Sequence, residues 1–249
     1  MSNHIRDKVV IVTGASSGIG EATAVALGDL GAKVVCAARR TDRIEAIAAR
    51  ISEQAGEAIA VECDVTDRGH VDQLIATTIE RFGGVDALVN NAGVMPLSPI
   101  EQCRVETWDQ MVDVNIKGVL YATAAVTPHF LERGAGHFIN ISSVAGRIVL
   151  PGASVYCGTK WFVHAFSDGL RAEMADKGIR VSIVAPGYVA TELLSHIADP
   201  GMKQMFDDMG RSMEVLQPED IASAVVYALE QPPHVSANEI LVRPTKQQL

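Results

Sequence analysis

The chain has 249 residues, of which 48% are hydrophobic and 20% are charged, and its formal net charge at pH 7 is −9. This composition can supply a buried core and excludes an intrinsically disordered chain. The acidic balance argues against a surface for nucleic acid or anionic lipid, so we expect neither as a partner.

The cysteines and the N-terminal residues bear on the compartment. No C-x-x-C pair occurs among Cys36, Cys63, Cys103 and Cys157, and no His/Cys cluster has zinc-ligand spacing, so we expect free thiols and no metal. Residues 1–8 are polar, and no apolar run reaches the ~18 residues that cross a membrane. We therefore expect a cytoplasmic protein.

Short apolar runs alternate with helical patterns along the chain. The runs predict strands over residues 9–13, 33–37, 58–63, 87–89, 137–141, 181–185 and 239–242. Helices are expected near 18–30, 42–55, 67–82, 106–132, 155–177 and 218–230. This alternation predicts an α/β Rossmann fold in a single domain, 1–249, with a doubly wound, parallel, seven-stranded sheet and helices on both faces.

A glycine-rich turn follows the first strand, where T-G-A-S-S-G-I-G occupies residues 13–20. Glycines allow a tight turn and close approach of the backbone, and the N-terminus of the next helix offers N–H groups to a pyrophosphate. A plain structural turn is the alternative. The expected dinucleotide contacts come from Gly14, Ser16, Ser17, Gly18, Ile19 and Gly20.

The end of the second strand bears on the choice of cofactor. NAD sites place an acidic residue there to bind the ribose hydroxyls. This chain has Ala38, Arg39 and Arg40 instead, so no carboxylate repels a 2′-phosphate and two guanidinium groups can bind it. The alternative is a solvated arginine pair that opens the next helix. We expect NADP, with Arg39 as the stronger phosphate ligand.

Two further motifs end the next strands. Asp64 and Val65 end the third strand and could contact an adenine, and N-N-A-G at 90–93 ends the fourth. The small residues Ala92 and Gly93 allow a cofactor to approach the backbone, and the Asn91 amide can brace the central strand. Either motif could instead be ordinary turn chemistry.

Tyr156 and Lys160 are four residues apart, and Ser143 lies 13 residues before the tyrosine. A spacing of four places both side chains on one helix face. A lysine ammonium beside a phenol favours the phenolate, so we expect the pKa of Tyr156 to fall below its usual value of roughly 10. A tyrosine tuned in this way can transfer a proton to a carbonyl oxygen.

Residues 192–214 interrupt the alternation after the sixth strand. They carry methionine and phenylalanine at helical spacing, which is more often core than pocket. Because ligands bind at the carboxyl edge of open α/β sheets, a substrate lid over about 190–214 is the second interpretation.

These motifs have a known counterpart. The chain resembles the short-chain dehydrogenase/reductase family over its full length, through T-G-A-S-S-G-I-G, D-V at 64–65, N-N-A-G, Asn115, I-S-S at 141–143, Y-C-G-T-K at 156–160 and P-G-Y-V-A-T at 186–191. Its ending, E-I-L-V-R-P-T at 239–245, resembles NADP-dependent bacterial reductases that act on 3-hydroxy acids, aldehydes and ketones.

The resemblance implies roles for individual residues. Ser143 binds the substrate oxygen, Tyr156 transfers the proton, Lys160 lowers the tyrosine pKa and binds the nicotinamide ribose, and Asn115 holds a relay water. The nicotinamide is flanked by Pro186, Gly187, Val189 and Thr191. Many NADP-using relatives have a basic residue where Ser17 stands, so the phosphate contact would depend on the arginines after the second strand.

The leading hypothesis is therefore an NADP(H)-dependent oxidoreductase that moves a hydride between nicotinamide and a carbonyl or secondary alcohol. The alternatives are an NAD-linked alcohol dehydrogenase and a non-catalytic NADP-binding sensor. The expected substrate pocket consists of Met95, Ser143, Val149, Leu150, Tyr188, Leu193, Met202, Met205 and Phe206. Arg147 could meet a substrate carboxylate or be solvated, and family precedent implies a homotetramer.

Overall fold

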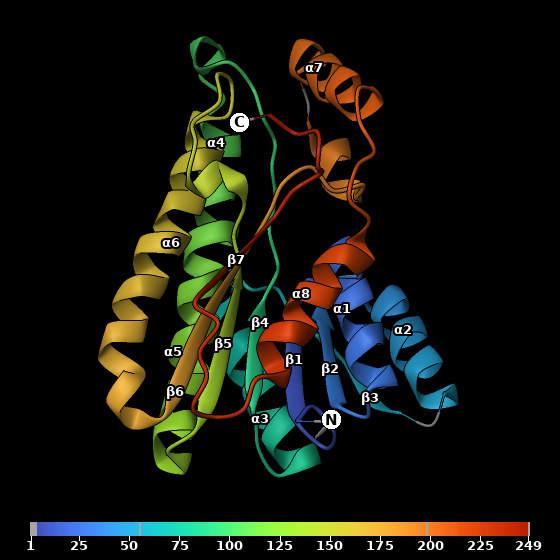
Figure 1. The fold of residues 1–249 in the computed structure, drawn as a ribbon, viewed down its shortest axis with the longest axis vertical. Helices are drawn as coiled ribbons and strands as arrows, with labels where there is room; N and C mark the ends of the chain where they lie inside the picture. The colour runs from blue at the N-terminus through green and yellow to red at the C-terminus, as the bar shows by residue number, and fades with distance from the viewer. Residues whose placement is uncertain (1–3, 55, 198, 249) are drawn as a thin grey trace.

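The computed structural model describes residues 4–54, 56–197 and 199–248. Its centre is one parallel sheet of seven strands in the order β3-β2-β1-β4-β5-β6-β7 (Figure 1). The strands are β1 (Val9–Thr13), β2 (Lys33–Ala38), β3 (Glu57–Glu62), β4 (Ala87–Asn90), β5 (Gly136–Ile141), β6 (Ile179–Pro186) and β7 (Glu239–Val242). The predicted doubly wound, seven-stranded parallel sheet is confirmed.

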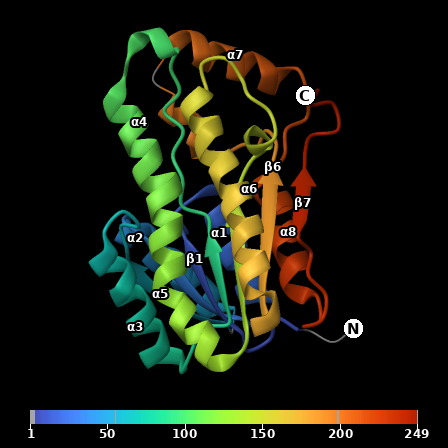
Figure 2. The ribbon, with the colours of Figure 1, turned by 90° about the vertical axis from the view of Figure 1, so that its left-hand side faces the viewer.

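Helices cover both faces of this sheet. They are α1 (Gly18–Asp29), α2 (Thr41–Glu53), α3 (Arg68–Phe82), α4 (Val105–Val112), α5 (Gly118–Arg133), α6 (Ser154–Met174), α7 (Pro200–Arg211) and α8 (Pro218–Glu230). One face packs against α1, α2 and α8, and the other packs against α3, α5 and α6 (Figures 1 and 2).

The strands form where the chain can bury both of its faces. Val9–Thr13 is buried throughout, as expected for a central parallel strand with helices on both sides. Alternate residues enter two separate cores, so Val10 and Val12 pack toward α1 and α8 while Ile11 packs toward α3 and α5. Packing on both faces therefore fixes the positions of the strand ends relative to one another.

The long helix predicted over 106–132 is divided. It consists of α4, a π-helical turn η2 (Asp113–Lys117) and α5. The turn contains Asn115, which is 1% exposed and hydrogen-bonds to the loop after β4. Apolar periodicity cannot predict this turn, because the cause is a contact with a distant loop. Residue 55, the expected last residue of the second helix, lies outside the described residues.

A third cluster of buried side chains lies beyond the carboxyl edge of the sheet. It joins the loop after β4 and the start of α6 to the segment after β6, through Met95, Leu97, Ala153, Tyr156 and Met202. That segment contains a short 3₁₀ helix, η5 (Glu192–His196), and α7, which lies across the end of the molecule in Figure 2.

The two ends of the segment lie side by side. Val189 pairs with Leu216 in an isolated β-bridge. The amide of Ala190 donates to the carbonyl oxygen of Leu216 at 2.8 Å, and the amide of Leu216 donates to the carbonyl oxygen of Tyr188 at 3.1 Å. Residues 190–215 therefore form a closed loop that begins and ends at the same point of the sheet edge. We call this segment the edge loop. Residue 198, within the predicted lid, lies outside the described residues.

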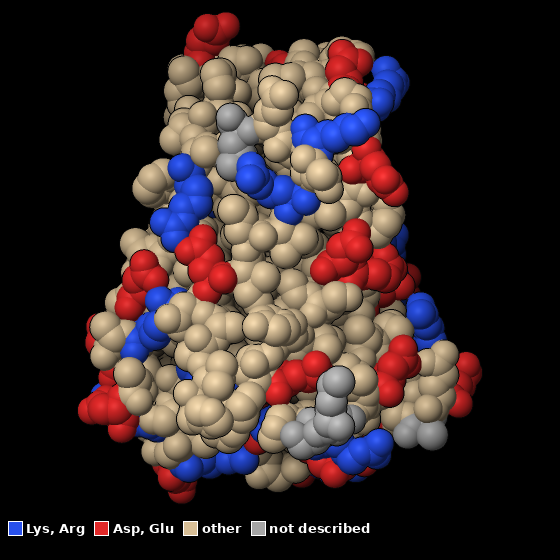
Figure 3. Space-filling model, in the orientation of Figure 1, with Lys and Arg blue, Asp and Glu red and all other residues tan. Residues whose placement is uncertain are grey.

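Basic and acidic side chains are interspersed on the face shown in Figure 3. No helix within the described ranges is both long and apolar enough to cross a membrane. Within those ranges, no group of three or more His, Cys, Asp or Glu side chains is arranged to hold a metal ion.

Candidate active site

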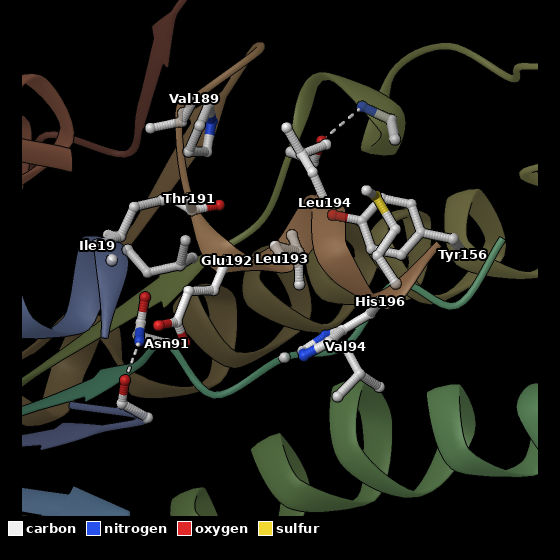
Figure 4. Close-up of a pocket in the computed structure, with 18 of the residues that line it drawn as sticks. Ile19, Asn91, Val94, Tyr156, Val189, Thr191, Glu192, Leu193, Leu194 and His196 are labelled. Atoms are coloured by element: carbon white, nitrogen blue, oxygen red, sulfur yellow. Dashed lines mark hydrogen bonds between the residues drawn. The ribbon is translucent and has the colours of Figure 1, made fainter. Parts of the chain in front are cut away.

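A cavity of about 540 Å³ opens at the carboxyl edge of the sheet. It lies between β1 and β4, the neighbouring strands at which the strand order changes direction. In open α/β sheets, ligands bind at this switch point. The lining comes from the turn after β1, the loops after β2, β3, β4 and β5, the start of α6, the edge loop and the C-terminal residues (Figure 4).

The glycine-rich turn has the geometry that a dinucleotide site requires. Gly14 and Gly18 have φ values of 65° and 56°, which are strained for residues with a side chain. A Cβ on Gly20 would lie 2.3 Å from the carbonyl oxygen of Gly14, so this glycine is needed for packing and does not line the cavity. Gly14, Ser16, Ser17, Gly18 and Ile19 do line it, beside the N-terminus of α1.

The loop after β4 is fixed to this turn. Thr13 Oγ1 accepts hydrogen bonds from the amides of Asn91 at 3.1 Å and Ala92 at 3.2 Å. The Asn91 side chain donates to the carbonyl oxygens of Thr13 at 2.9 Å and Gly14 at 3.2 Å. The structure therefore places Asn91, Ala92 and Gly93 on the cavity wall, with Asp64 and Val65 nearby.

Arginine side chains line the cavity after β2. Arg40 donates to Ser16 Oγ through Nε at 3.1 Å and through Nη2 at 2.8 Å, and Nη2 also donates to Ser17 Oγ at 2.7 Å. Arg39 is more exposed and lies 3.9 Å from Asp64. Hydroxyl and guanidinium donors in this arrangement fit a phosphate, so the donor set suits the predicted 2′-phosphate.

An acidic side chain from the edge loop reaches Arg40 and also Arg43 of α2. Glu192 accepts from Arg40 Nη1 at 2.9 Å and from Arg43 Nη1 at 2.7 Å and 3.0 Å. Hydrogen bonds from Arg40 and Arg43 lower the pKa of Glu192 to about 2. Figure 4 shows the Glu192 side chain turned away from Tyr156, toward the region of Ile19 and Asn91.

The structure brings the predicted catalytic side chains together at the other end of the cavity. Ser143 follows β5, while Tyr156 and Lys160 lie one turn apart on α6. Lys160 Nζ donates to the carbonyl oxygen of Ile141 at 3.0 Å and lies 5.8 Å from the centre of the Tyr156 ring. The Tyr156 hydroxyl is directed into the cavity (Figure 4).

The electrostatics differ from the expectation in one respect. Burial raises the pKa of Tyr156 to about 12, against a smaller lowering by its hydrogen bond with the Ser143 side chain. Burial also lowers the pKa of Lys160 to about 8. The predicted lowering of the tyrosine pKa by the ammonium is therefore not seen here: burial dominates, and the opposing contribution comes from Ser143 rather than from Lys160.

Asn115 lies behind the cavity wall. Its side chain accepts from the Val94 amide at 2.9 Å, and donates to the Val94 carbonyl oxygen at 2.9 Å and to Thr159 Oγ1 at 3.2 Å. These bonds join the π-helical turn to the loop after β4 and to α6. The side chain therefore holds the backbone beside Gly93 in position.

The predicted substrate pocket is partly corrected. Met95, Ser143, Leu150, Tyr188, Leu193 and Phe206 line the cavity. Val149 and Met205 do not line the cavity; they lie on the surface, 63% and 41% exposed. Met202 is buried against Gly152, behind the cavity wall. Helical spacing alone predicts that the methionines act together. Because α7 is amphipathic, Met202 faces the buried cluster while Met205 faces the surface.

Arg147 does not line the cavity. Its guanidinium pairs with Glu239 of β7, through Nε–Oε1 at 3.1 Å and through Nη2–Oε2. Of the two predicted alternatives, the solvated one fits better, because the Arg147 side chain is 48% exposed and pairs with Glu239 at the surface. Glu239 is 92 residues away in the sequence, so local spacing gave no indication of it.

Several lining residues were missed by the sequence analysis. They are Val94, Leu194, His196, Glu192, Gln247 and Gln248. Glu192 pairs with Arg40, 152 residues away, so no local sequence signal indicated it. No sequence signal indicated Gln247, whose Oε1 accepts from the Tyr188 amide at 3.0 Å.

Comparisons with known proteins agree with this geometry. The family model described as short chain dehydrogenase matches residues 8–200. An uncharacterized oxidoreductase of Staphylococcus saprophyticus is 46% identical over 250 residues, covering 99% of this chain and 100% of the relative.

Solved structures are similar over nearly the whole chain. The closed form of a serine dehydrogenase complexed with NADP⁺ has a TM-score of 0.89 at 33% identity, covering 97% of this chain and 96% of that chain. An alcohol dehydrogenase of the archaeon Thermococcus sibiricus complexed with 5-hydroxy-NADP has a TM-score of 0.85 at 31% identity, covering 98% and 99%. The chain thus belongs to the short-chain dehydrogenase family of oxidoreductases.

Proposed function

We propose that the protein is an NADP(H)-dependent oxidoreductase that transfers a hydride between nicotinamide and a carbonyl compound or secondary alcohol. One observation carries this proposal. Ser143, Tyr156 and Lys160 line the same cavity as a glycine-rich turn and a cluster of arginine and serine side chains. Proton-transfer groups and a dinucleotide site thus share one enclosed space.

The cofactor assignment rests on the loop after β2. Ala38 leaves room, Arg39 and Arg40 supply positive charge, and the serine hydroxyls add donors for a 2′-phosphate. The similar solved structures that contain NADP⁺ and 5-hydroxy-NADP support the same cofactor. The nicotinamide end would lie along Pro186, Gly187, Val189 and Thr191, and the cofactor would supply the hydride chemistry.

The chain itself supplies orientation and the proton. Ser143 and Tyr156 offer hydroxyl groups to the same carbonyl oxygen, so negative charge that develops there meets two donors. The raised pKa keeps the phenol protonated near neutral pH, as required of a general acid in the direction of reduction. Burial lowers the pKa of Lys160 to about 8, so near neutral pH it brings a mostly protonated ammonium to the same wall.

The substrate half of the cavity is mostly apolar. Its wall includes Met95, Leu150, Leu193 and Phe206, and the edge loop acts as the lid. Among the described lining residues, Lys160 is the only lysine or arginine in this half of the cavity. Arg147 lies outside it and is paired with Glu239. These contacts favour a neutral ketone or aldehyde with an apolar body over a carboxylated one.

The test compares the wild type with Tyr156→Phe, which removes the hydroxyl and keeps the ring. With NADPH and a panel of neutral and carboxylated carbonyls, we expect kcat to fall by at least ~10²-fold, because the proton donor is lost. NADPH affinity, measured by fluorescence titration, should stay within about threefold.

Three results would contradict parts of this proposal. Near-normal turnover by Tyr156→Phe would remove the tyrosine from the role of acid. A wild type that prefers NADH would favour the NAD-linked alternative. NADPH binding without turnover of any carbonyl or alcohol would favour the sensor.

The homotetramer implied by the family resemblance belongs to the same proposal. Its support lies on α6, where Trp161 is 46% exposed and the ring of Phe162 stacks on that of Phe166. Aromatic side chains are enriched in subunit interfaces, so the exposed tryptophan is a candidate contact. Light scattering coupled to size-exclusion chromatography measures the number of subunits.

A further inference from the structure

The phosphate-binding groups already have an anionic partner within the chain. Arg40 uses Nε and Nη2 for the serine hydroxyls, and its remaining Nη1 donates to Glu192. Arg43, one turn into α2, binds both oxygens of the same carboxylate. Glu192 therefore occupies the side of Arg40 that is not engaged by the serines.

A 2′-phosphate held by Arg40 would have to share these donors. It carries up to two negative charges, and the carboxylate of Glu192 is an ion of the same sign bound to the same guanidinium. Like charges this close repel each other, most strongly where the neighbouring protein excludes water. A nucleotide without the 2′-phosphate brings no such charge to Arg40.

We propose that Glu192 and the 2′-phosphate compete for Arg40 and Arg43, which makes Glu192 a specificity-determining residue that weakens binding of the phosphorylated cofactor. The inference rests on the proposed NADP(H) function and adds two residues to its site. Arg43 becomes a second phosphate ligand once the carboxylate is displaced. Because Glu192 begins η5, the same exchange changes how the edge loop is held.

The loop has other attachments that do not involve these arginines. Tyr188 donates through its hydroxyl to the carbonyl oxygen of Phe206 at 3.0 Å, and Gln102 donates to Asp199 at 2.6 Å. Displacement of Glu192 would therefore release its two ion pairs, to Arg40 and Arg43, and leave the loop in place. We infer that the chain exchanges a carboxylate for a phosphate without having to unfold this segment.

The experiment uses nucleotide fragments, so it does not depend on turnover. Binding of 2′,5′-ADP and of 5′-ADP is measured by calorimetry for the full-length wild type and for Glu192→Gln, which keeps the shape and removes the charge. We expect 2′,5′-ADP to bind at least about threefold more tightly to the variant, since each ion pair here is partly exposed. Affinity for 5′-ADP should change less than twofold.

Asp42→Asn is the matched control. It removes one carboxylate from the first turn of α2, close enough to affect Arg43, but it makes none of the described hydrogen bonds to Arg40 or Arg43. Its effect on 2′,5′-ADP should stay below about twofold. Raising the salt concentration to 0.5 M should shrink the difference between the wild type and Glu192→Gln.

The outcomes separate this inference from the function on which it rests. If the wild type does not prefer 2′,5′-ADP to 5′-ADP, the NADP assignment is wrong. If the wild type prefers 2′,5′-ADP but Glu192→Gln binds it equally or more weakly, competition is wrong and Glu192 instead holds the arginines in position. If Glu192→Gln and Asp42→Asn gain equally, the effect is general charge and the inference fails.

Discussion

Asn115 has a structural role in addition to the catalytic role that the family resemblance implies. It is 1% exposed, and it binds both the amide and the carbonyl oxygen of Val94, in the loop that also carries Gly93. The family resemblance implies a relay water near this residue. The hydrogen bonds add a second role, since they hold the loop after β4 against the π-helical turn.

Asn115→Leu should therefore affect folding as well as turnover. The substitution leaves the amide and the carbonyl of Val94 without their buried partner, and each unsatisfied group costs about 1–3 kcal/mol. We expect the free energy of unfolding in urea to fall by at least about 2 kcal/mol.

Asn115→Asp is the matched variant for this residue. It keeps the acceptor for the Val94 amide and loses the donor, so its stability should lie between those of Asn115→Leu and the wild type. Wild-type stability in Asn115→Leu together with a large loss of kcat would mean that the residue acts in the relay alone.

At the scale of elements, the edge loop is held by Tyr188. The Tyr188 hydroxyl donates to the carbonyl oxygen of Phe206 in α7, and the Tyr188 amide is bound by Gln247 from the C-terminal residues. This residue joins β6, the edge loop and the chain end. Loss of its hydroxyl should loosen α7 without disturbing the sheet.

Tyr188→Phe tests this attachment by limited proteolysis. Lys203 and Arg211 in α7 are trypsin sites, and a buried hydrogen bond contributes about 0.5–1.5 kcal/mol to local stability. We expect cleavage at these sites to accelerate by about two- to tenfold. Tyr227→Phe, at an exposed position on α8, should cleave at the wild-type rate. Equal rates for Tyr188→Phe and the wild type would show that other contacts hold the loop.

The elements also show how much the sequence can predict. Apolar runs located every strand of the sheet, most clearly the central ones, because a central parallel strand buries both faces and stands out from amphipathic helices. The division of the expected helix 106–132 and the burial of Met202 could not be predicted. Both depend on contacts with segments far away in the sequence. The spacing of apolar residues predicts which face of a helix is apolar, but not which segment packs against that face.

The same limit applies within the site. The glycine turn, the Tyr156–Lys160 pair and the arginine pair are local motifs, and their residue types predict the chemistry. Glu192 and Glu239 pair with arginines 152 and 92 residues away, so local patterns could not assign them. The predicted direction of the Tyr156 pKa shift was wrong, because the sequence does not show how deeply the phenol is buried.

At the scale of the whole molecule, a buried histidine couples stability to pH. His137 on β5 is 3% exposed and contacts Ser182 of β6 at 2.8 Å. Burial, with smaller contributions from Arg180 and Lys8, holds the pKa of His137 well below its usual value of 6.5. Below pH 6.5 the unfolded chain therefore binds a proton that the folded chain does not, and stability falls as the pH is lowered.

We expect this histidine to contribute a loss of about 1.4 kcal/mol per pH unit below about pH 6.5. Unfolding free energies at several pH values between 7.5 and 5 should show a shallower slope for His137→Asn than for the wild type. His234→Asn removes an exposed histidine and should keep the wild-type slope. Identical slopes for His137→Asn and the wild type would mean that the folded protein accepts the proton.

The closed edge loop has a consequence for how this scaffold could be diversified. Its two ends meet at Val189 and Leu216, so the apolar wall proposed for the substrate lies on a segment that leaves the sheet edge and returns to the same point. A combinatorial library restricted to Leu193, Leu194, Phe206 and Met209 would sample new substrate shapes while the cofactor cradle stays constant. Laboratory evolution could thus vary substrate recognition at these four positions while Thr191 and Glu192, on the cofactor side of the same loop, are left unchanged.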